Sequence, residues 1–190
     1  MKNLILLLTL TLTTLGSVAQ NKLDSLILTE VNNYRYCRGL SEIIWDDSVY
    51  VNSKEHTTYL STIGVCTHYQ EEYVQGHTNK SLGERISTTS YPDDVILISV
   101  HENLGLLTTA KGDTVKRSDE QIAKLIVELW DNSPTHNTIL NMEVILRDIN
   151  GKGVMRGAVS TVKSTYRKGE KWKNRKNPWV YITLNFVESY

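Results

Sequence analysis

The chain has 190 residues, of which 40% are hydrophobic and 22% are charged, enough for one globular domain with a single core. Its 21 Lys and Arg residues balance its 21 Asp and Glu residues, so the formal net charge at neutral pH is zero. This balance excludes the strongly basic class of nucleic-acid-binding domains and gives no reason to expect an anionic surface as a partner.

The first twenty residues, "MKNLILLLTLTLTTLGSVAQ", have the pattern of a secretory signal peptide. Lys2 precedes an apolar run, and Ser17-Val18-Ala19 forms a small-residue cleavage site. We therefore expect a signal peptide over residues 1–19 and one domain over residues 20–190, in a secreted or periplasmic protein. The alternative is an uncleaved anchor, although the run is short and rich in Thr for a transmembrane helix. We expect no membrane span after cleavage.

The first half of the domain carries two helical patterns. Apolar residues from Leu23 onward recur at helical spacing and predict a helix that ends near Arg38-Gly39. After a connection, "LSEIIWDDS", Asp46 or Asp47 can cap a second helix that ends by Gly64. Residues 66–94 are polar and indicate loops, with at most one short helix around residues 82–86.

The second half begins with an apolar, strand-like run over residues 95–100. Ser118 and Gln121 fit a capping box at the start of an amphipathic helix, and Ser133 with Pro134 predicts a further short helix. The last part, including "PWVYITLNFVESY", alternates as strands do. Helices come first and strands last, so the fold class is α+β, in one domain.

The segment "RKGEKWKNRKN" between the last two predicted strands has two interpretations. It is either a solvated hairpin loop, which we favour, or a basic docking patch with Trp172 as its anchor.

Cys37 and Cys66 are the only two cysteines. An oxidising compartment permits a disulfide between them, and closing a loop of roughly 30 residues contributes about 3–4 kcal/mol in the chain-entropy model. The alternative is two buried free thiols. Neither cysteine lies in a spacing typical of structural zinc.

Three of the five histidines have clear contexts. His56 lies within the second predicted helix, where a hydrogen-bonded packing histidine is expected. His101 and Glu102 would point to opposite faces of an extended segment. Glu102 also follows a strongly apolar run, so its carboxylate must be paired, hydrogen-bonded or neutralised, unless it lies on an exposed loop. His136 stands at a helix start, where the helix dipole lowers an imidazole pKa and favours the neutral form that binds metals or acts as a base.

Taken in order, several motifs resemble those of the CAP superfamily (cysteine-rich secretory proteins, antigen 5 and pathogenesis-related 1, the SCP domain) in its short bacterial form. The motifs are "VNNYRYCRGLSEIIWDDSVYVNSKEHTTYL", "CTHYQ", "GERI", "HENLG", "IVELWDNSPTHNTIL" and "WVYITLNF". They span roughly residues 23–186, and "HENLG" followed by "LWDNSPTHNTIL" is the most specific pair.

The resemblance implies an α–β–α sandwich, with a small central antiparallel sheet flanked by helices. It also implies a cleft lined by two histidines and one or two acidic residues, which in some members holds a divalent metal such as zinc or magnesium. Carried over to this chain, the cleft and metal residues are His68, Glu102 and His136, with His77 as the alternative to His68. The chain departs from the family after Trp130, where longer members carry a second glutamate, and its last strand lacks the family's Thr-Gln.

The function predicted from these residues is an extracytoplasmic binding module for a divalent metal, a lipid, or a peptide or protein ligand. The absence of a Gly-x-Ser-x-Gly elbow and of HExxH fits binding better than catalysis. The alternative is a metal-dependent hydrolase or protease that uses the same cleft. A third hypothesis assigns binding to the basic segment around Trp172 and leaves the cleft vestigial.

Overall fold

The computed structural model describes residues 21–71, 80–87, 97–111, 115–143, 154–168 and 178–189. The helices are α1 (Lys22–Tyr36), α2 (Asp47–Ile63), α3 (Leu82–Ser87), α4 (Asp119–Asp131) and α5 (Pro134–Leu140). The strands are β1 (Ile43–Trp45), β2 (Leu97–Thr108), β3 (Ala110–Lys111), β4 (Val115–Lys116), β5 (Val154–Ser164) and β6 (Trp179–Ser189). None of the helices within these ranges is long and apolar enough to cross a membrane.

Local capping explains where the long helices begin and end. Asp46 accepts hydrogen bonds from the first backbone N–H groups of α2, and Gly64 ends that helix in the left-handed conformation with φ of 72°. Ser118 and Gln121 form the predicted capping box at the start of α4. The helices predicted from the sequence are therefore confirmed, including the short α3.

Four strands form one sheet in the order β1-β5-β6-β2, and β3 pairs with β4 in a separate small ribbon. The last strand, β6, lies in the interior of the sheet and pairs antiparallel with both β5 and β2 along most of their lengths. The edge strand β1 pairs with β5 in parallel, so the sheet is mixed rather than purely antiparallel. We expected residues 43–45 to be a connection, and in this respect the prediction was wrong.

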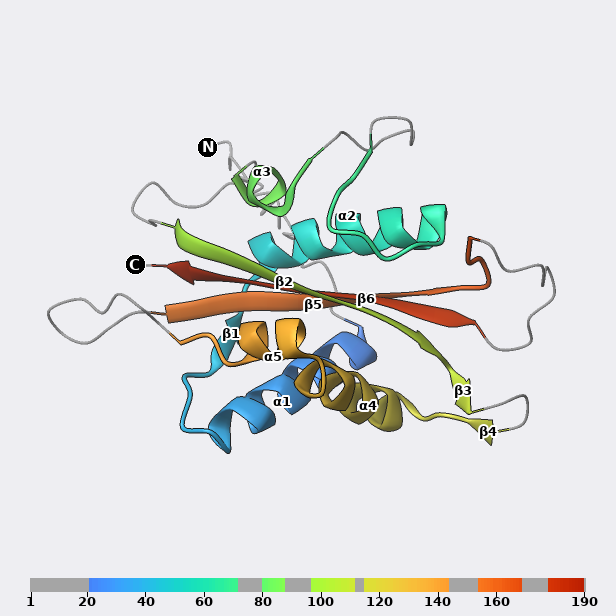
Figure 1. Cartoon of the computed structure of the whole chain (residues 1–190), viewed down its shortest axis with the longest axis horizontal. Coiled ribbons are helices and arrows are strands. Elements are labelled where there is room, and N and C mark those ends of the chain that lie inside the picture. The colour runs from blue at the N-terminus through green and yellow to red at the C-terminus, as the bar shows by residue number, and fades with distance from the viewer. Residues whose placement is uncertain are drawn as a thin grey trace, which may run out of the picture.

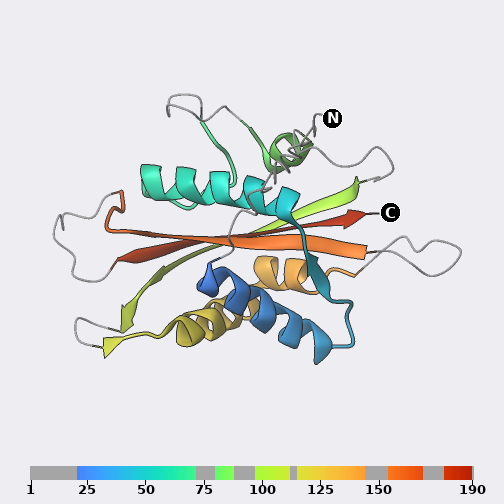
Figure 2. The same ribbon diagram turned by 180° about the vertical axis from the view of Figure 1, so that it is seen from behind.

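Helices cover both faces of the sheet, as Figures 1 and 2 show from opposite sides. One face carries α2 and α3, and the other carries α1, α4 and α5. The side chains of β6 alternate between these faces, which we name the α2 face and the α1 face. Val180, Ile182, Leu184 and Phe186 lie in the main hydrophobic core on the α1 face. The predicted α–β–α sandwich is therefore confirmed.

The two cysteines do not pair in this structure. Cys37 follows α1 and Cys66 follows α2, and both are exposed free thiols. Because α1 and α2 cover opposite faces of the sheet, the ends of these helices are held apart by the layer between them (Figure 1). The predicted disulfide is thus absent, and the two thiols are free, as the alternative held, but exposed rather than buried.

Several predictions concern residues outside the described ranges. They are the signal peptide over residues 1–19, His77, and the basic segment around Trp172. These remain predictions.

Candidate functional site

Glu102 is the centre of a buried polar cluster on β2. Its side chain is only 1% exposed, and its two carboxylate oxygens have separate partners. Oε1 lies 2.7 Å from Nδ1 of His68, and Oε2 lies 2.5 Å from a guanidinium nitrogen of Arg85. Burial opposes ionisation, but the His68 hydrogen bond and the nearby positive groups outweigh it, so the pKa of Glu102 lies below its usual value. The expectation that this carboxylate must be paired is confirmed.

Arg85, on the short helix α3, joins this carboxylate to the loop that follows α2. Its guanidinium donates to the backbone carbonyl of His68 at 2.8 Å, besides its ion pair with Glu102. It therefore fixes both the backbone of His68 and the carboxylate that holds the His68 ring. Sequence reasoning did not assign this role, although Arg85 lies in the quoted motif "GERI".

His68 presents one ring nitrogen outward. An ionised carboxylate can only accept a hydrogen bond, so the short contact to Glu102 places the proton of a neutral His68 on Nδ1. Nε2 is then the nitrogen with a free lone pair, and the side chain is 55% exposed. The arrangement matches the carboxylate–histidine pairs that orient metal-binding imidazoles in proteins.

His56, a buried residue of α2, makes hydrogen bonds to the loop that follows this helix. Its Nε2 lies 2.9 Å from the carbonyl of Thr67, and its Nδ1 accepts from Gln70 at 3.3 Å. The ring is fully buried, and burial lowers its pKa to about 4, so it is neutral. The expectation of a hydrogen-bonded packing histidine is confirmed.

His136 approaches from the opposite side of the sheet, on the first turn of α5. Its Nδ1 lies 2.8 Å from the hydroxyl of Ser133, and its backbone carbonyl accepts a hydrogen bond from the side chain of Asn103. Its pKa is lowered, as expected, but the causes are burial and the neighbouring His68. Ser133 is the N-cap residue of α5, but its side chain makes no capping hydrogen bond and instead contacts His136.

The strand explains how the two histidines are held together. Successive side chains of a strand point to opposite faces, so Glu102 reaches His68 on the α2 face while Asn103 reaches α5 on the other face. Since β2 is an edge strand, the two histidines flank the edge of the sheet. The adjacent residue His101 packs on Phe186, on the face opposite to Glu102, as predicted.

Two further contacts hold α5, and therefore His136, in place. Arg35 of α1 is fully buried and donates to the carbonyls of Leu140 and Met142 at the C-terminal end of α5. Near its other end, Asn137 donates to Asp131, which also accepts from the hydroxyl of Tyr34 at 2.7 Å. Sequence reasoning missed these positioning residues, because the contacts of Arg35 and Tyr34 join residues about 100 positions apart in the chain.

The three residues predicted as cleft ligands do not have equal roles. His68 and His136 each have a ring nitrogen that is not engaged in the contacts above, whereas the oxygens of Glu102 are occupied inside the protein. Within the described part of the chain, no group of three or more His, Cys, Asp or Glu side chains is placed to hold a metal ion. Of the three predicted residues, His68 and His136 are therefore the ones that offer a ring nitrogen, and Glu102 orients His68.

Comparisons with known proteins agree with the architecture. The sequence matches no protein-family model and no curated protein sequence. Among solved structures, it is similar to an outer surface protein from Borrelia burgdorferi, with 16% identity and a TM-score of 0.52, over 86% of this chain and 90% of that one. It is also similar to an extracellular protein containing an SCP domain from Bacillus anthracis, with 16% identity and a TM-score of 0.50, over 87% of this chain and 40% of that one. The chain therefore has the fold of the SCP domain, the fold of the CAP superfamily.

Proposed function

We propose that the protein is an extracytoplasmic binding module in which His68 and His136 hold the polar part of the ligand. The observation that carries this proposal concerns the Glu102 carboxylate: both of its oxygens contact other protein groups, His68 and Arg85. The site therefore offers a ligand imidazole nitrogens rather than a carboxylate. An oriented neutral imidazole accepts a hydrogen bond or binds a borderline metal ion.

Two observations support a location outside the cytoplasm. The N-terminal segment has the pattern of a signal peptide, and the two similar structures are described as an outer surface protein and an extracellular protein.

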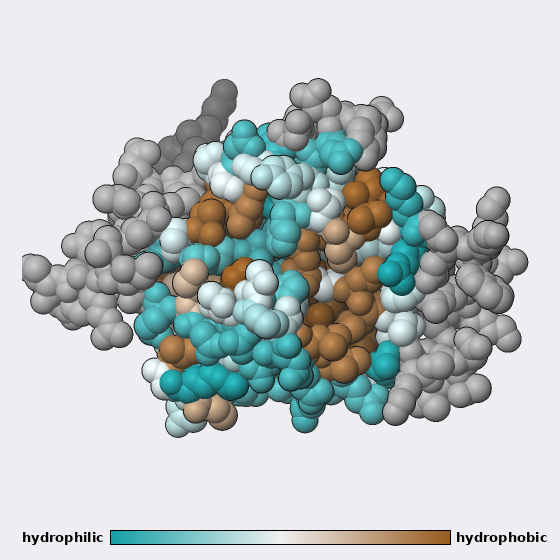
Figure 3. Space-filling model, in the orientation of Figure 1, coloured by the Kyte–Doolittle hydropathy of each residue, from teal (hydrophilic) through white to brown (hydrophobic). Residues whose placement is uncertain are grey.

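An apolar surface on β2, the strand that carries Glu102, supports a ligand that is partly apolar, such as a lipid or a peptide. Figure 3 shows a brown patch over the C-terminal half of β2, between α2 and α4. Leu106, in that half of the strand, is only partly buried. Exposed apolar surface of this kind commonly marks a binding site.

The same geometry disfavours the alternative, a metal-dependent hydrolase. Such an enzyme typically has three protein ligands and a separate general base. Glu102 is the acidic residue that contacts the His68 ring, and its buried carboxylate cannot serve as an open ligand or base without losing Arg85 or His68. A bound zinc ion would be held by His68 and His136 and would supply a positive centre for a ligand's polar group.

Calorimetric titration with zinc and, separately, with magnesium tests the proposal. Imidazole binds zinc, whereas magnesium requires oxygen ligands. We expect zinc to bind and magnesium not to bind, and we expect the double variant His68→Ala/His136→Ala to lose zinc binding. The matched control is His101→Ala, a histidine of β2 whose Nε2 is bonded to Ser99. Zinc binding that survives in the double variant, or magnesium binding of similar strength, would contradict the proposal.

A further inference from the structure

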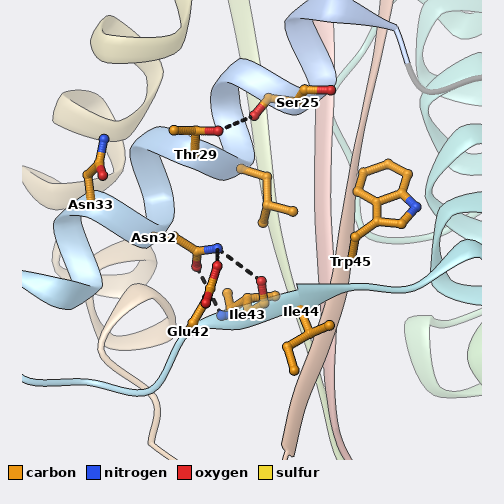
Figure 4. Close-up of a pocket in the computed structure, with 9 residues that line it drawn as sticks. Ser25, Thr29, Asn32, Asn33, Glu42, Ile43, Ile44 and Trp45 are labelled. Atoms are coloured by element: carbon orange, nitrogen blue, oxygen red, sulfur yellow. Dashed lines mark hydrogen bonds between the residues drawn. The ribbon is translucent and has the colours of Figure 1, made fainter.

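A pocket lies at the edge of the sheet away from the histidines. It lies between α1 and β1, and β1 is the edge strand opposite to β2. The pocket has a volume of about 490 Å³ and is drawn in Figure 4. This volume is within the range of about 300–1,000 Å³ that is usual for small-molecule sites.

One wall of the pocket is polar and largely uncharged. Thr29 and Asn33 are exposed on α1, and Asn32 lies between them and the strand. The hydroxyl of Thr29 donates to the carbonyl of Ser25 at 2.9 Å, which leaves its lone pairs available to a ligand. Glu42 adds one exposed carboxylate at the end of the strand (Figure 4).

The other wall is apolar and contains a fixed aromatic ring. Trp45 donates from Nε1 to Asp47 at 2.8 Å, and its ring centroid lies 4.9 Å from that of Tyr50. These two contacts hold the indole in one orientation. The preceding residue Ile44 is 50% exposed and points to the opposite face of β1 from Trp45 (Figure 4).

The edge of β1 in this pocket is closed to an added peptide strand. The side chain of Asn32 donates to the carbonyl of Ile43 at 3.0 Å and accepts from its N–H at 2.9 Å. The amide thus occupies the backbone groups that a peptide would need for strand addition. Of the described side chains that line the pocket, Glu42 is the only acidic or basic one, so an anionic ligand is disfavoured as well.

We propose that this pocket binds a carbohydrate of one or two sugar rings. A pyranose has an apolar face of C–H groups that packs on an aromatic ring, and a rim of hydroxyls that both donate and accept. Trp45 supplies the first surface, while Thr29, Asn33 and Glu42, whose Oε1 accepts from Asn32 at 3.3 Å, supply the partners for the hydroxyls. The stretch of α1 from Ser25 to Asn33 is about 12 Å long, at about 1.5 Å per residue, which suits a disaccharide.

The test is a titration of the full chain with maltose, cellobiose, lactose and N,N′-diacetylchitobiose, followed by saturation-transfer NMR and calorimetry. We expect at least one of them to bind with a dissociation constant in the millimolar range or tighter. Thr29→Val and Asn33→Ala each remove one ligand-facing hydrogen-bonding group and should weaken binding about three- to tenfold. Trp45→Leu should abolish it.

The matched control is Thr62→Val. Thr62 is also an exposed helical threonine, and its hydroxyl donates to the carbonyl four residues earlier at 2.9 Å. It should leave sugar binding unchanged, as should His68→Ala/His136→Ala. If no sugar of the panel binds at millimolar concentrations, or if Thr29→Val and Asn33→Ala bind as the unaltered chain does, the proposal is overturned. The last two variants alter exposed side chains, so the test does not depend on the stability of Trp45→Leu.

Discussion

The two faces of the sheet are built from the same strands but on different principles. On the α1 face, one continuous apolar cluster joins β6 to α1, α4 and α5. On the α2 face, two smaller clusters, around Val49 and around Tyr59, are separated by buried polar side chains. These polar residues are Asn52, Ser53, His56, Thr57, Glu102, Ser160, Thr183 and Asn185.

The difference indicates a division of roles. Apolar packing is non-directional and supplies most of the stability of a domain, whereas a buried polar network fixes the orientation of its members. The α1 face therefore holds the layers together, and the α2 face holds Glu102 and His68 in one geometry. The predictions below test whether apolar packing on the α1 face and polar contacts on the α2 face contribute differently.

The largest expected effect is on the α2 face, at the buried ion pair. Arg85→Met leaves the Glu102 carboxylate buried without its guanidinium partner, and we expect the free energy of unfolding to fall by about 3–5 kcal/mol in denaturant titrations. Adding Glu102→Gln should recover much of this loss, since the uncompensated charge is then gone.

The control is Lys22→Met, which breaks the exposed ion pair with Glu120 and should have little effect. If Arg85→Met were as mild as this control, the polar network would not be a stability determinant of the α2 face.

The next prediction compares substitutions at two neighbouring residues of β6 whose side chains point to opposite faces of the sheet. Leu184→Ala opens a cavity in the main core and should lower the free energy of unfolding by about 2–5 kcal/mol. Thr183→Val is nearly isosteric and removes a buried hydroxyl with no hydrogen-bond partner among the described residues, so it should be neutral or stabilising. Chemical denaturation of both variants measures their free energies of unfolding. If Thr183→Val lowered this free energy as much as Leu184→Ala does, the prediction would be wrong.

The third effect is absent at neutral pH and appears only as the pH falls, and it belongs to the α2 face. The pKa of His56 is lowered to about 4 in the folded protein, against about 6.5 in an unfolded chain, so the unfolded state binds the proton first. The contribution of His56 to stability is therefore complete above about pH 6.5 and is lost as the pH falls toward 4, at up to about 1.4 kcal/mol per pH unit.

The measurement is the free energy of unfolding from pH 7 to pH 4 for the unaltered chain and for His56→Gln, which should lack this slope. Asp24 acts in the opposite direction below pH 6, because burial raises its pKa to about 6, and it is common to both proteins. Only the difference between the two curves reports His56, and parallel curves would contradict the prediction.

The features that the sequence predicts well are those with local causes. Asp46, Ser118 and Gln121 mark helix starts within a few residues of the groups they cap. The apolar run before Glu102 also predicts a partner for its carboxylate wherever that side chain is buried.

The features that the sequence does not predict depend on distant partners. The strand β1 has three residues, and its pairing partner begins at Met155, more than 100 residues later. The cysteines were expected to pair because of their number and the compartment, but they follow helices on opposite faces. Arg85 and Arg35 likewise acquire their roles only when the loop after α2 and the end of α5 are brought to them.

The position of β6 has a consequence for how the chain reaches this structure. The final strand in sequence order is the one that joins β5 to β2, so neither pairing can form before residues 179–189 are available. Completion of the sheet is then a late event relative to synthesis, because β5 and β2 lack their shared partner until residues 179–189 are present. A polypeptide threaded through a translocation pore in an unfolded form would complete its fold only after its last segment had emerged.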